Sequence, residues 1–360
     1  MVRAGDAAEQ HFVREALLAL GSDRPGLRDA ARAVRSWDRV LAIAAAGSVA
    51  ESIWSGVSLR GVEREIPEPA RTSLREAHAG ATARNALLLS EAAEIQAAFT
   101  AAGIESVILK GPGLLVAHYP DIGARHVADV DILVRGGEVA RRANAIVRAR
   151  GGQPKLKPLV PMEEAEDAHH HLEPLVTPRG VVFEIHTRVP WADPSDPDVE
   201  NIFGHTRSVS WQGWELRIPS APDLAVMLCR HVFDYHGGLK EYLARHLADM
   251  AVLMGTGAAV WSDLEVRVGS RSSLVALTAS RFLVEDGRVG SAARRHVLGV
   301  RTRVWVNLIT RQEPRVVMRA VFPPRSFMSG RYGVHPTSRM LPLLYLWRPV
   351  RGAWRFVTGR

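Results

Sequence analysis

The sequence predicts an α/β fold of the α+β type, in which helices flank a small mixed sheet and helical regions precede and follow it. Three observations support this fold class. Apolar residues recur with helical spacing in the first 102 residues. Runs typical of strands then follow at 106–109, 127–134 and 181–189. Beyond residue 210 the apolar pattern is helical again, so the sheet is expected in the middle of the chain.

The N-terminal region divides into helices. Its clearest helical segments are EQHFVREALLAL and RAVRSWDRVLAIAAAGSVAESIW. Pro67 and Pro69 break the pattern, and residues 81–102 are predicted to form one long helix that leads into the first strand.

A glycine-rich turn follows the first strand. Gly111, Pro112 and Gly113 form this turn, and a helical pattern restarts at Leu114. The N–H groups at the start of a helix attract phosphate, and glycine lets a ligand approach the backbone closely. Lys110 precedes the turn and is one of only four lysines beside 42 arginines. It indicates that a compact point charge is needed here, although chance placement is an equal alternative.

Two aspartates lie in the second strand. Asp129 and Asp131 are two residues apart, so both side chains project from one face, while Val130 and Ile132 point into the core. Carboxylates placed in this way suit Mg²⁺ beside a phosphate. On its own an Asp-x-Asp pair more often marks a strand end or a loop, so the surrounding motif carries the prediction.

The third strand belongs to a predicted hairpin. Residues 169–177 lead through a turn at Pro178, Arg179 and Gly180 into residues 181–189. Strict alternation places Glu184 and His186 on one face of that strand. His169, His170 and His171 are consecutive and alternate between faces, so a zinc site is not expected. A structural role is favoured for them, with His171 near the rim of the site.

Together these segments resemble the uncharacterised nucleotidyltransferase family of the DNA polymerase β-like superfamily, a group that also occurs near lasso-peptide biosynthesis genes. The matching residues are Leu109-Lys110-Gly111, Leu114, Tyr119-Pro120-Asp121, Gly123, Arg125 and Asp129-Val130-Asp131-Ile132-Leu133-Val134.

The resemblance implies a metal-dependent transfer of a nucleoside monophosphate from an NTP, with ATP expected, to an unidentified acceptor, releasing pyrophosphate. Asp129, Asp131 and Glu184 would bind Mg²⁺ or Mn²⁺ as the catalytic residues, and Lys110, Gly111 and Arg125 would bind the nucleotide. Glu184 is assigned through the family's Glu-Ile/Leu-His element. In the family a tryptophan follows this element, whereas here it is displaced to Trp191. The acceptor can be a small molecule, a peptide or a protein.

The family pattern continues into the next helices. Ser220 is the expected N-cap of a helix over the following apolar stripe, and a second amphipathic helix begins near residue 240. His231, His236 and Asp249 match the family here and, with His186, are possible accessory residues. The equal alternative is that they connect the two helices in a polar core.

Composition limits the class of protein. The chain has 360 residues, 47% of them hydrophobic, so it can bury a large core and is not disordered. Cys229 is the single cysteine, which excludes an intrachain disulfide and suggests a reducing compartment. No secretory signal or transmembrane segment is recognisable, so a cytoplasmic protein is expected.

The C-terminal region is strongly basic. Residues 265–360 contain 18 arginines and four acidic residues, a net charge of +14, while the whole chain carries +8. This region could bind nucleic acid or another anionic partner, but packing against the acidic N-terminal part is the favoured alternative. The expected organisation is therefore a helical region (1–80), an α/β core (81–210), a helical subdomain (211–264) and a basic, mostly helical region (265–360).

Two other functions are also compatible with the sequence. An antitoxin-like or partner-binding protein can be built on the same scaffold, and a nucleic-acid-binding protein can use the basic region. The complete set of three carboxylates favours an active enzyme.

Overall fold

The computed structural model describes residues 7–155, 171–189, 199–235, 240–267, 271–286 and 338–347. Helices open the chain, as their apolar spacing predicts. Ser36 accepts a hydrogen bond from the amide of Arg39 and so caps the third of them. The N-terminal elements are α1 (Ala7–Leu18), α2 (Leu27–Arg32), α3 (Trp37–Gly47), α4 (Ala50–Leu59) and the 3-10 turn η1 (Glu63–Glu65).

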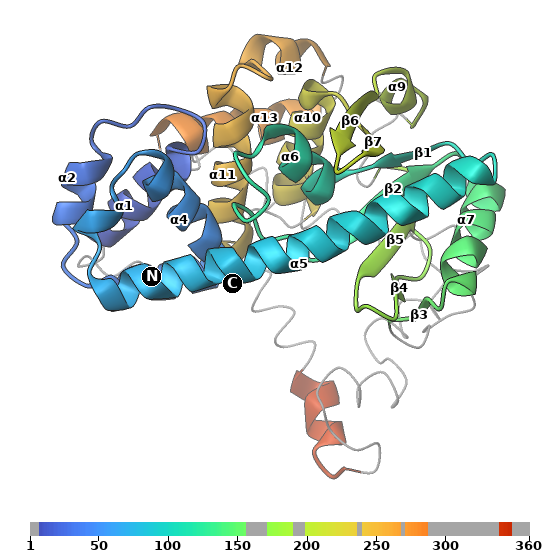
Figure 1. The fold of residues 1–360 in the computed structure, drawn as a ribbon, viewed down its shortest axis with the longest axis horizontal. Coiled ribbons are helices and arrows are strands. Elements are labelled where there is room, and N and C mark those ends of the chain that lie inside the picture. The colour runs from blue at the N-terminus through green and yellow to red at the C-terminus, as the bar shows by residue number, and fades with distance from the viewer. Residues whose placement is uncertain are drawn as a thin grey trace.

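The long helix begins earlier than predicted. Helix α5 spans Glu68–Ala101, or 34 residues, and runs beneath the body from the N-terminal helices to the sheet (Figure 1). Pro69 lies in its first turn, where the missing N–H has no helical acceptor to lose, so the prolines start the helix and do not break it. Helix α5 passes through residue 80 without interruption. The proposed division of the chain into four regions stays a prediction.

The central sheet is mixed, in agreement with the predicted fold class. Its five strands follow the order β1-β2-β5-β4-β3. The central strands β2 and β5 are parallel, and the other neighbouring pairs are antiparallel. The predicted hairpin is confirmed as β4 and β5, joined through Gly180 with a φ of +85°. The strands are β1 (Ser106–Ile108), β2 (Val130–Val134), β3 (Gln153–Pro154), β4 (Leu175–Val176) and β5 (Val182–His186).

Two predicted boundaries near the aspartates are wrong by a few residues. Strand β2 starts at Val130, so Asp129 lies directly before it, although the two strand residues Val130 and Ile132 are fully buried as predicted. Helix α6 (Lys110–His118) starts at Lys110 and not at Leu114. Glycine and proline are tolerated in a first helical turn, and the predicted turn is therefore part of the helix. Helix α7 (Gly137–Ala149) follows β2.

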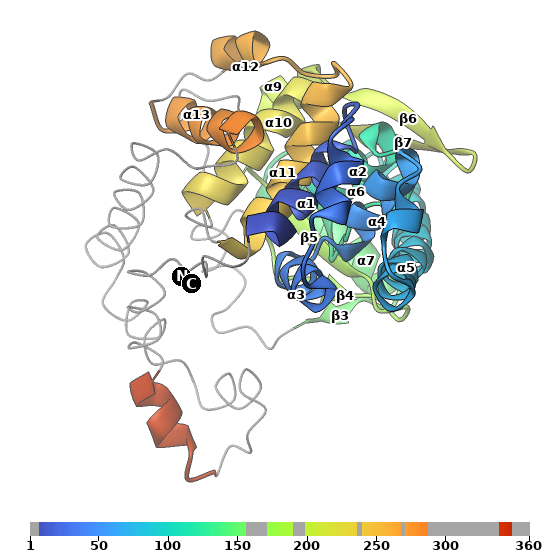
Figure 2. The same ribbon diagram turned by 90° about the vertical axis from the view of Figure 1, so that its left-hand side faces the viewer.

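The second half of the described chain is helical apart from one β-hairpin. Helix α11 packs against α1 and α3 on one side and against α10 and α13 on the other, and Figure 2 shows it beside α1. Ser220 caps α10, as predicted, by accepting from the amide of Asp223. The elements are α9 (Val199–Gly204), β6 (Arg207–Trp211), β7 (Trp214–Ile218), α10 (Ala221–Arg230), the π-helical turn η2 (His231–Tyr235), α11 (Lys240–Gly255), α12 (Trp261–Arg267), α13 (Arg271–Asp286) and a short helix over 341–347.

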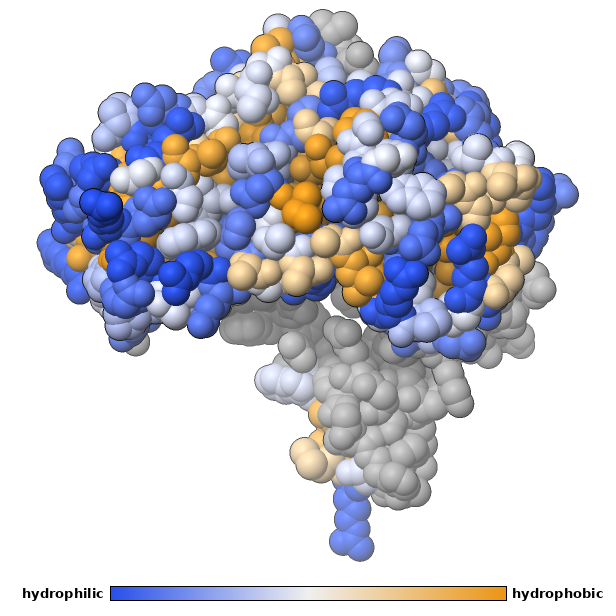
Figure 3. All heavy atoms as spheres, viewed as in Figure 1, coloured by the Kyte–Doolittle hydropathy of each residue, from blue (hydrophilic) through white to orange (hydrophobic). Residues whose placement is uncertain are grey.

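One apolar cluster connects the N-terminal helices, the sheet and helices α10 to α13. On the face shown in Figure 3, apolar side chains lie in small groups among hydrophilic ones. Within the described ranges, no single helix has both the length and the apolar character to cross a bilayer, and α3 with α4 qualifies only as a pair bent by 117°. Most of the basic C-terminal region lies outside the described residues.

Candidate functional site

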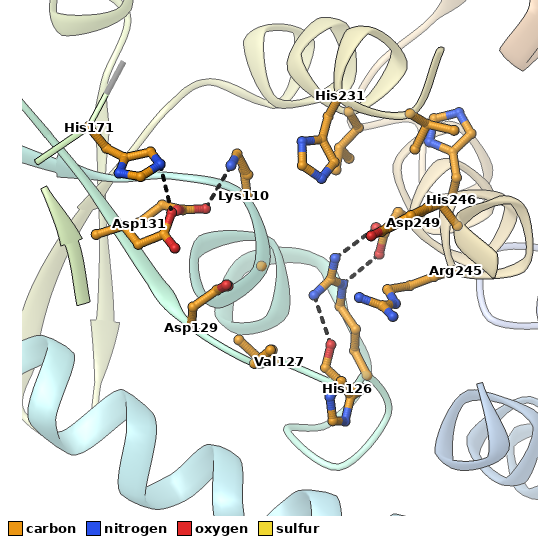
Figure 4. Close-up of a pocket in the computed structure, with 17 residues that line it drawn as sticks. Lys110, His126, Val127, Asp129, Asp131, His171, His231, Arg245, His246 and Asp249 are labelled. Carbon is orange, nitrogen blue, oxygen red and sulfur yellow. Dashed lines mark hydrogen bonds and ion pairs between the residues drawn. The ribbon is translucent and has the colours of Figure 1, made fainter. Parts of the chain in front are cut away.

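A cavity of about 400 Å³ lies between the central sheet and the helices that follow it (Figure 4). This volume is within the range of ligand pockets. Two groups of charged residues border it. We call Lys110, Asp129, Asp131 and Glu184 the carboxylate wall, and Arg125, Tyr242, Arg245, His246 and Asp249 the arginine wall.

The carboxylate wall is formed by the two parallel strands. Asp131 on β2 lies directly opposite Glu184 on β5 in the strand register. Asp129 lies directly before β2, two residues ahead of Asp131, and lines the same cavity. All three predicted carboxylates line the cavity.

Asp131 is the most deeply buried of the three, with 4% of its surface exposed. Its Oδ2 lies 2.9 Å from Lys110 Nζ, and its Oδ1 lies 2.8 Å from His186 Nε2. Burial alone would favour the neutral acid, but the charges of Lys110 and His186 hold the pKa of Asp131 well below its usual value. Asp131 is therefore ionised, and both of its oxygens accept hydrogen bonds.

The other two carboxylates lack such compensation. Burial, followed by repulsion from Asp131, raises the pKa of both Asp129 and Glu184. Within the described part of the chain, Asp129 has no hydrogen bond or ion pair. Glu184 Oε2 lies 3.8 Å from His186 Nε2 and 3.9 Å from His171 Nε2. Negative charge thus accumulates on this face, which a cation would relieve.

The donor atoms fit a divalent metal. One ligand atom from each of Asp131, Glu184 and His186 lies within 4.8 Å of the others. This set differs from the predicted one, since His186 takes the place of Asp129. An ionised Asp131 accepts the hydrogen of His186 Nε2, so His186 acts here as a hydrogen-bond donor. Carboxylate oxygens are also the ligands that Mg²⁺ prefers, and these residues therefore fit a hard cation.

Lys110 has a strained backbone. Its φ is +49°, a left-handed conformation that is uncommon for a residue with a side chain. Burial opposes its charge, but attraction to Asp131 raises its pKa above the usual value. Such strain concentrates at functional sites. In this conformation Lys110 starts α6 while its ammonium group reaches Asp131.

Gly111 and Arg125 are in close contact. A Cβ atom on Gly111 would lie 2.8 Å from Arg125 Nη1, so glycine makes room for the guanidinium group. Arg125 donates from Nε and Nη2 to the two oxygens of Asp249, at 2.7 and 2.9 Å, and the Tyr119 hydroxyl donates to Asp249 at 2.6 Å. The predicted residue Arg125 therefore reaches the cavity already paired with a carboxylate. Its role toward a nucleotide stays a prediction.

The four possible accessory residues have different positions. His186 is fully buried behind the carboxylate wall, and His231 on η2 lines the cavity. Asp249 connects α11 to Arg125 and Tyr119, which agrees with the alternative that it forms part of a polar core. His236 and Trp191, like His169 and His170, lie outside the described residues. His171 lines the cavity, as predicted for a residue at the rim.

Most residues of the arginine wall were not predicted from the sequence. Tyr242, Arg245 and His246 line the cavity together with Asp249. Their spacing of three, four and seven residues places them on one face of α11. This polar stripe beside the apolar residues of the same helix was the available signal.

Comparison with known proteins agrees with this site. A family model described as uncharacterised nucleotidyltransferase matches residues 34–286, a range that contains every cavity residue named above. No curated protein matches the chain. The association with lasso-peptide genes stays a prediction. The match covers most of the chain, which therefore belongs to the uncharacterised nucleotidyltransferase family.

Proposed function

We propose that this protein is a metal-dependent nucleotidyltransferase that moves a nucleoside monophosphate from an NTP to an acceptor and releases pyrophosphate. The observation that carries the proposal is the register of β2 and β5. It brings Asp131 and Glu184 side by side, and Asp129 and Lys110 line the same cavity. The family match supports a transferase acting on nucleotides.

Asp129, Asp131 and Glu184 would hold Mg²⁺ or Mn²⁺. When bound, a divalent ion neutralises the carboxylates and polarises the phosphate oxygens. The raised pKa of Asp129 and of Glu184 supports this assignment, because the same crowding that disfavours their ionisation favours a cation.

Lys110 and Gly111 would position the triphosphate. Gly111 lies in the first turn of α6, where backbone N–H groups without helical partners can donate to phosphate oxygens. Lys110 adds a positive charge held in place by Asp131. Arg125 would add a second positive charge near the same turn, and this charge is partly neutralised by Asp249.

The reaction would proceed by attack of an acceptor hydroxyl on the α-phosphorus. A new phosphorus–oxygen bond forms, the bond from the α-phosphorus to the bridging oxygen breaks, and pyrophosphate leaves. The proton of the hydroxyl would pass to Glu184, the carboxylate that lies opposite Asp131 in the strand register and lines the cavity. For an acceptor phosphate no proton transfer is needed.

The first test is binding, because it needs no knowledge of the acceptor. We would measure the melting temperature with each of the four NTPs in the presence and absence of Mg²⁺. A ligand at a hundred times its Kd stabilises the folded state by about 2.7 kcal/mol. We expect a magnesium-dependent rise with at least one NTP, with ATP as the expected substrate.

Asp129→Asn is the informative variant. Asp129 has no ion pair within the described ranges, so its replacement leaves no buried lysine without a partner, whereas an Asp131 variant would. Asp129→Asn should abolish the magnesium-dependent rise, and Asp23→Asn, at an exposed position in a loop, should retain it.

The outcomes separate the three functions. A magnesium-dependent shift lost in Asp129→Asn supports the transferase. No shift with any NTP would instead favour an antitoxin-like or partner-binding protein on this scaffold. Salt-sensitive binding of nucleic acid that survives Asp129→Asn would favour the basic C-terminal region as the functional part. The acceptor, the cytoplasmic location and the link to lasso peptides stay predictions.

A further inference from the structure

Arg245 differs from the other cationic residues of the cavity. Lys110 is paired with Asp131, and Arg125 is paired with Asp249. Arg245 lines the same cavity, but within the described residues it has no hydrogen bond or ion pair, and its Nε is buried without a partner. A guanidinium group held in this way has lost hydration without gaining a protein acceptor.

The nearest acidic residues do not satisfy Arg245. Both oxygens of Asp249 accept from Arg125, and Oδ1 also accepts from Tyr119. Glu51 interacts with Arg245 only at longer range, and burial raises the pKa of Glu51. Burial lowers the pKa of Arg245, and the charge of Arg125 lowers it further. The guanidinium group is therefore placed beside another cation and needs an anion.

The histidines around it add no positive charge near neutral pH. Burial lowers the pKa of His246 to about 4. Burial and the charge of Arg84 lower the pKa of His126 to about 4 as well. The excess positive charge of this wall therefore belongs to Arg245, which lies near Asp249 in Figure 4 and close enough to Arg125 to feel its charge.

We propose that Arg245 binds the terminal phosphates of the NTP and holds the pyrophosphate as it leaves. This inference rests on the proposed function. Arg125 packs against Gly111 at the start of α6, and Arg245 lines the same cavity within range of the charge of Arg125, so it extends the phosphate-binding surface from that turn onto α11. A guanidinium group presents a planar fork of donors that matches two phosphate oxygens at once.

The proposal gives Arg245 a defined part in the reaction. When the bond from the α-phosphorus to the bridging oxygen breaks, negative charge develops on the pyrophosphate. A cation aimed at the β- and γ-phosphates stabilises this charge without touching the nucleoside monophosphate that is transferred. Arg245 should therefore distinguish an NTP from the corresponding NMP.

The test compares the Kd of the NTP, the NMP and inorganic pyrophosphate by calorimetry with Mg²⁺ present. For Arg245→Gln we expect the Kd of the NTP and of pyrophosphate to rise by roughly tenfold to a hundredfold, the scale for hydrogen bonds between charged groups. The Kd of the NMP should stay within about twofold, since no proposed contact is lost. Arg245→Lys keeps the charge but not the planar fork of donors. Its Kd values for the NTP and pyrophosphate should therefore lie between those of the wild type and of Arg245→Gln.

Arg75→Gln is the matched control. Arg75 is exposed on α5 and has no hydrogen bond or ion pair within the described ranges, so its loss changes the net charge without altering the cavity. Its nucleotide affinities should equal those of the wild type. Arg245→Gln removes a charge that has no partner among the described residues, so the variant should melt close to the wild type. If it does not fold, Arg245→Lys decides the question with the same three ligands.

Two results would overturn the proposal. An Arg245 variant that weakens NTP and NMP equally would place the residue at the nucleoside or in general packing. A variant that binds all three ligands like the wild type would show that the terminal phosphates lie elsewhere, with the proposed function intact. A wild-type protein that binds no NTP would reject the proposed function itself, and this inference with it.

Discussion

On the carboxylate wall of the cavity three carboxylates share one lysine, whereas on the arginine wall two arginines share one carboxylate. Each wall contains one buried ion pair, Lys110 with Asp131 and Arg125 with Asp249. What remains beside these pairs is opposite in sign, with Asp129 and Glu184 on one wall and Arg245 on the other. A metal–nucleotide complex provides a cation for the first wall and an anion for the second, so a single ligand would balance both.

The ion pair of the arginine wall should have the largest effect on stability. Asp249→Ala would leave Arg125 buried without its partner, and we expect the free energy of unfolding to fall by about 3–5 kcal/mol. The measurement is urea denaturation followed by circular dichroism.

The matched control is the double variant Arg125→Met/Asp249→Leu. It removes both charges and should be clearly more stable than Asp249→Ala, because no buried charge is left unpaired. If Asp249→Ala loses less than about 1 kcal/mol, Arg125 finds another acceptor or solvent, and the arginine wall does not depend on this ion pair.

The carboxylate wall should be the one that binds metal. Asp129→Asn should lower the affinity for Mn²⁺, measured by electron paramagnetic resonance without nucleotide, by at least about tenfold, or roughly 1.4 kcal/mol. The physical reason is that Asp129 would offer a metal ion a carboxylate oxygen that has no competing partner in the described part of the chain.

His186→Asn distinguishes the two possible ligand sets. If the metal is held by the three carboxylates, this variant disturbs only the hydrogen bond to Asp131 and should weaken Mn²⁺ binding less than Asp129→Asn does. The reverse order would assign the site to the cluster of Asp131, Glu184 and His186.

The same contrast explains how far the sequence could predict the site. The carboxylate wall depends partly on a period of two within a single strand, so Asp129 and Asp131 could be placed on one face from local spacing. The family resemblance then assigned Glu184, on a separate strand, as the third carboxylate of the site. Even the start of α6 was misplaced by only four residues, because glycine and proline weaken a helical pattern without preventing it.

The arginine wall depends on tertiary contacts. The bonds to Asp249 join residues that lie 124 and 130 positions apart, and no local pattern predicts that Arg125 and Tyr119 meet there. Arg245 is one of 42 arginines, so its residue type carried no signal. Its unpaired state can be recognised only when the positions of its neighbours are known.

The smallest expected effect is a pH dependence from the arginine wall. His246 Nε2 forms a hydrogen bond with the Ser280 hydroxyl at 2.8 Å. Burial lowers the pKa of His246 from 6.5 to about 4. A histidine with a lowered pKa binds a proton more readily in the unfolded chain than in the folded one. Its contribution to stability is therefore complete above pH 6.5 and is lost as the pH falls from 6.5 toward 4.

Between pH 7 and 5.5 this loss should amount to about 1 kcal/mol. Over the same pH range, the unfolding free energy of His246→Gln should therefore fall by about 1 kcal/mol less than that of the wild type. This difference does not depend on the absolute stability of the variant. His11→Gln, at an exposed histidine on α1, is the control and should keep the wild-type profile. Parallel profiles for wild type and His246→Gln would mean that folding does not lower the pKa of His246, so that the residue gains a proton in the folded protein as the pH falls from about 7 to 5.5. The arginine wall would then carry more positive charge than Arg245 alone provides, and Arg245 would no longer be the only excess cation available to the terminal phosphates.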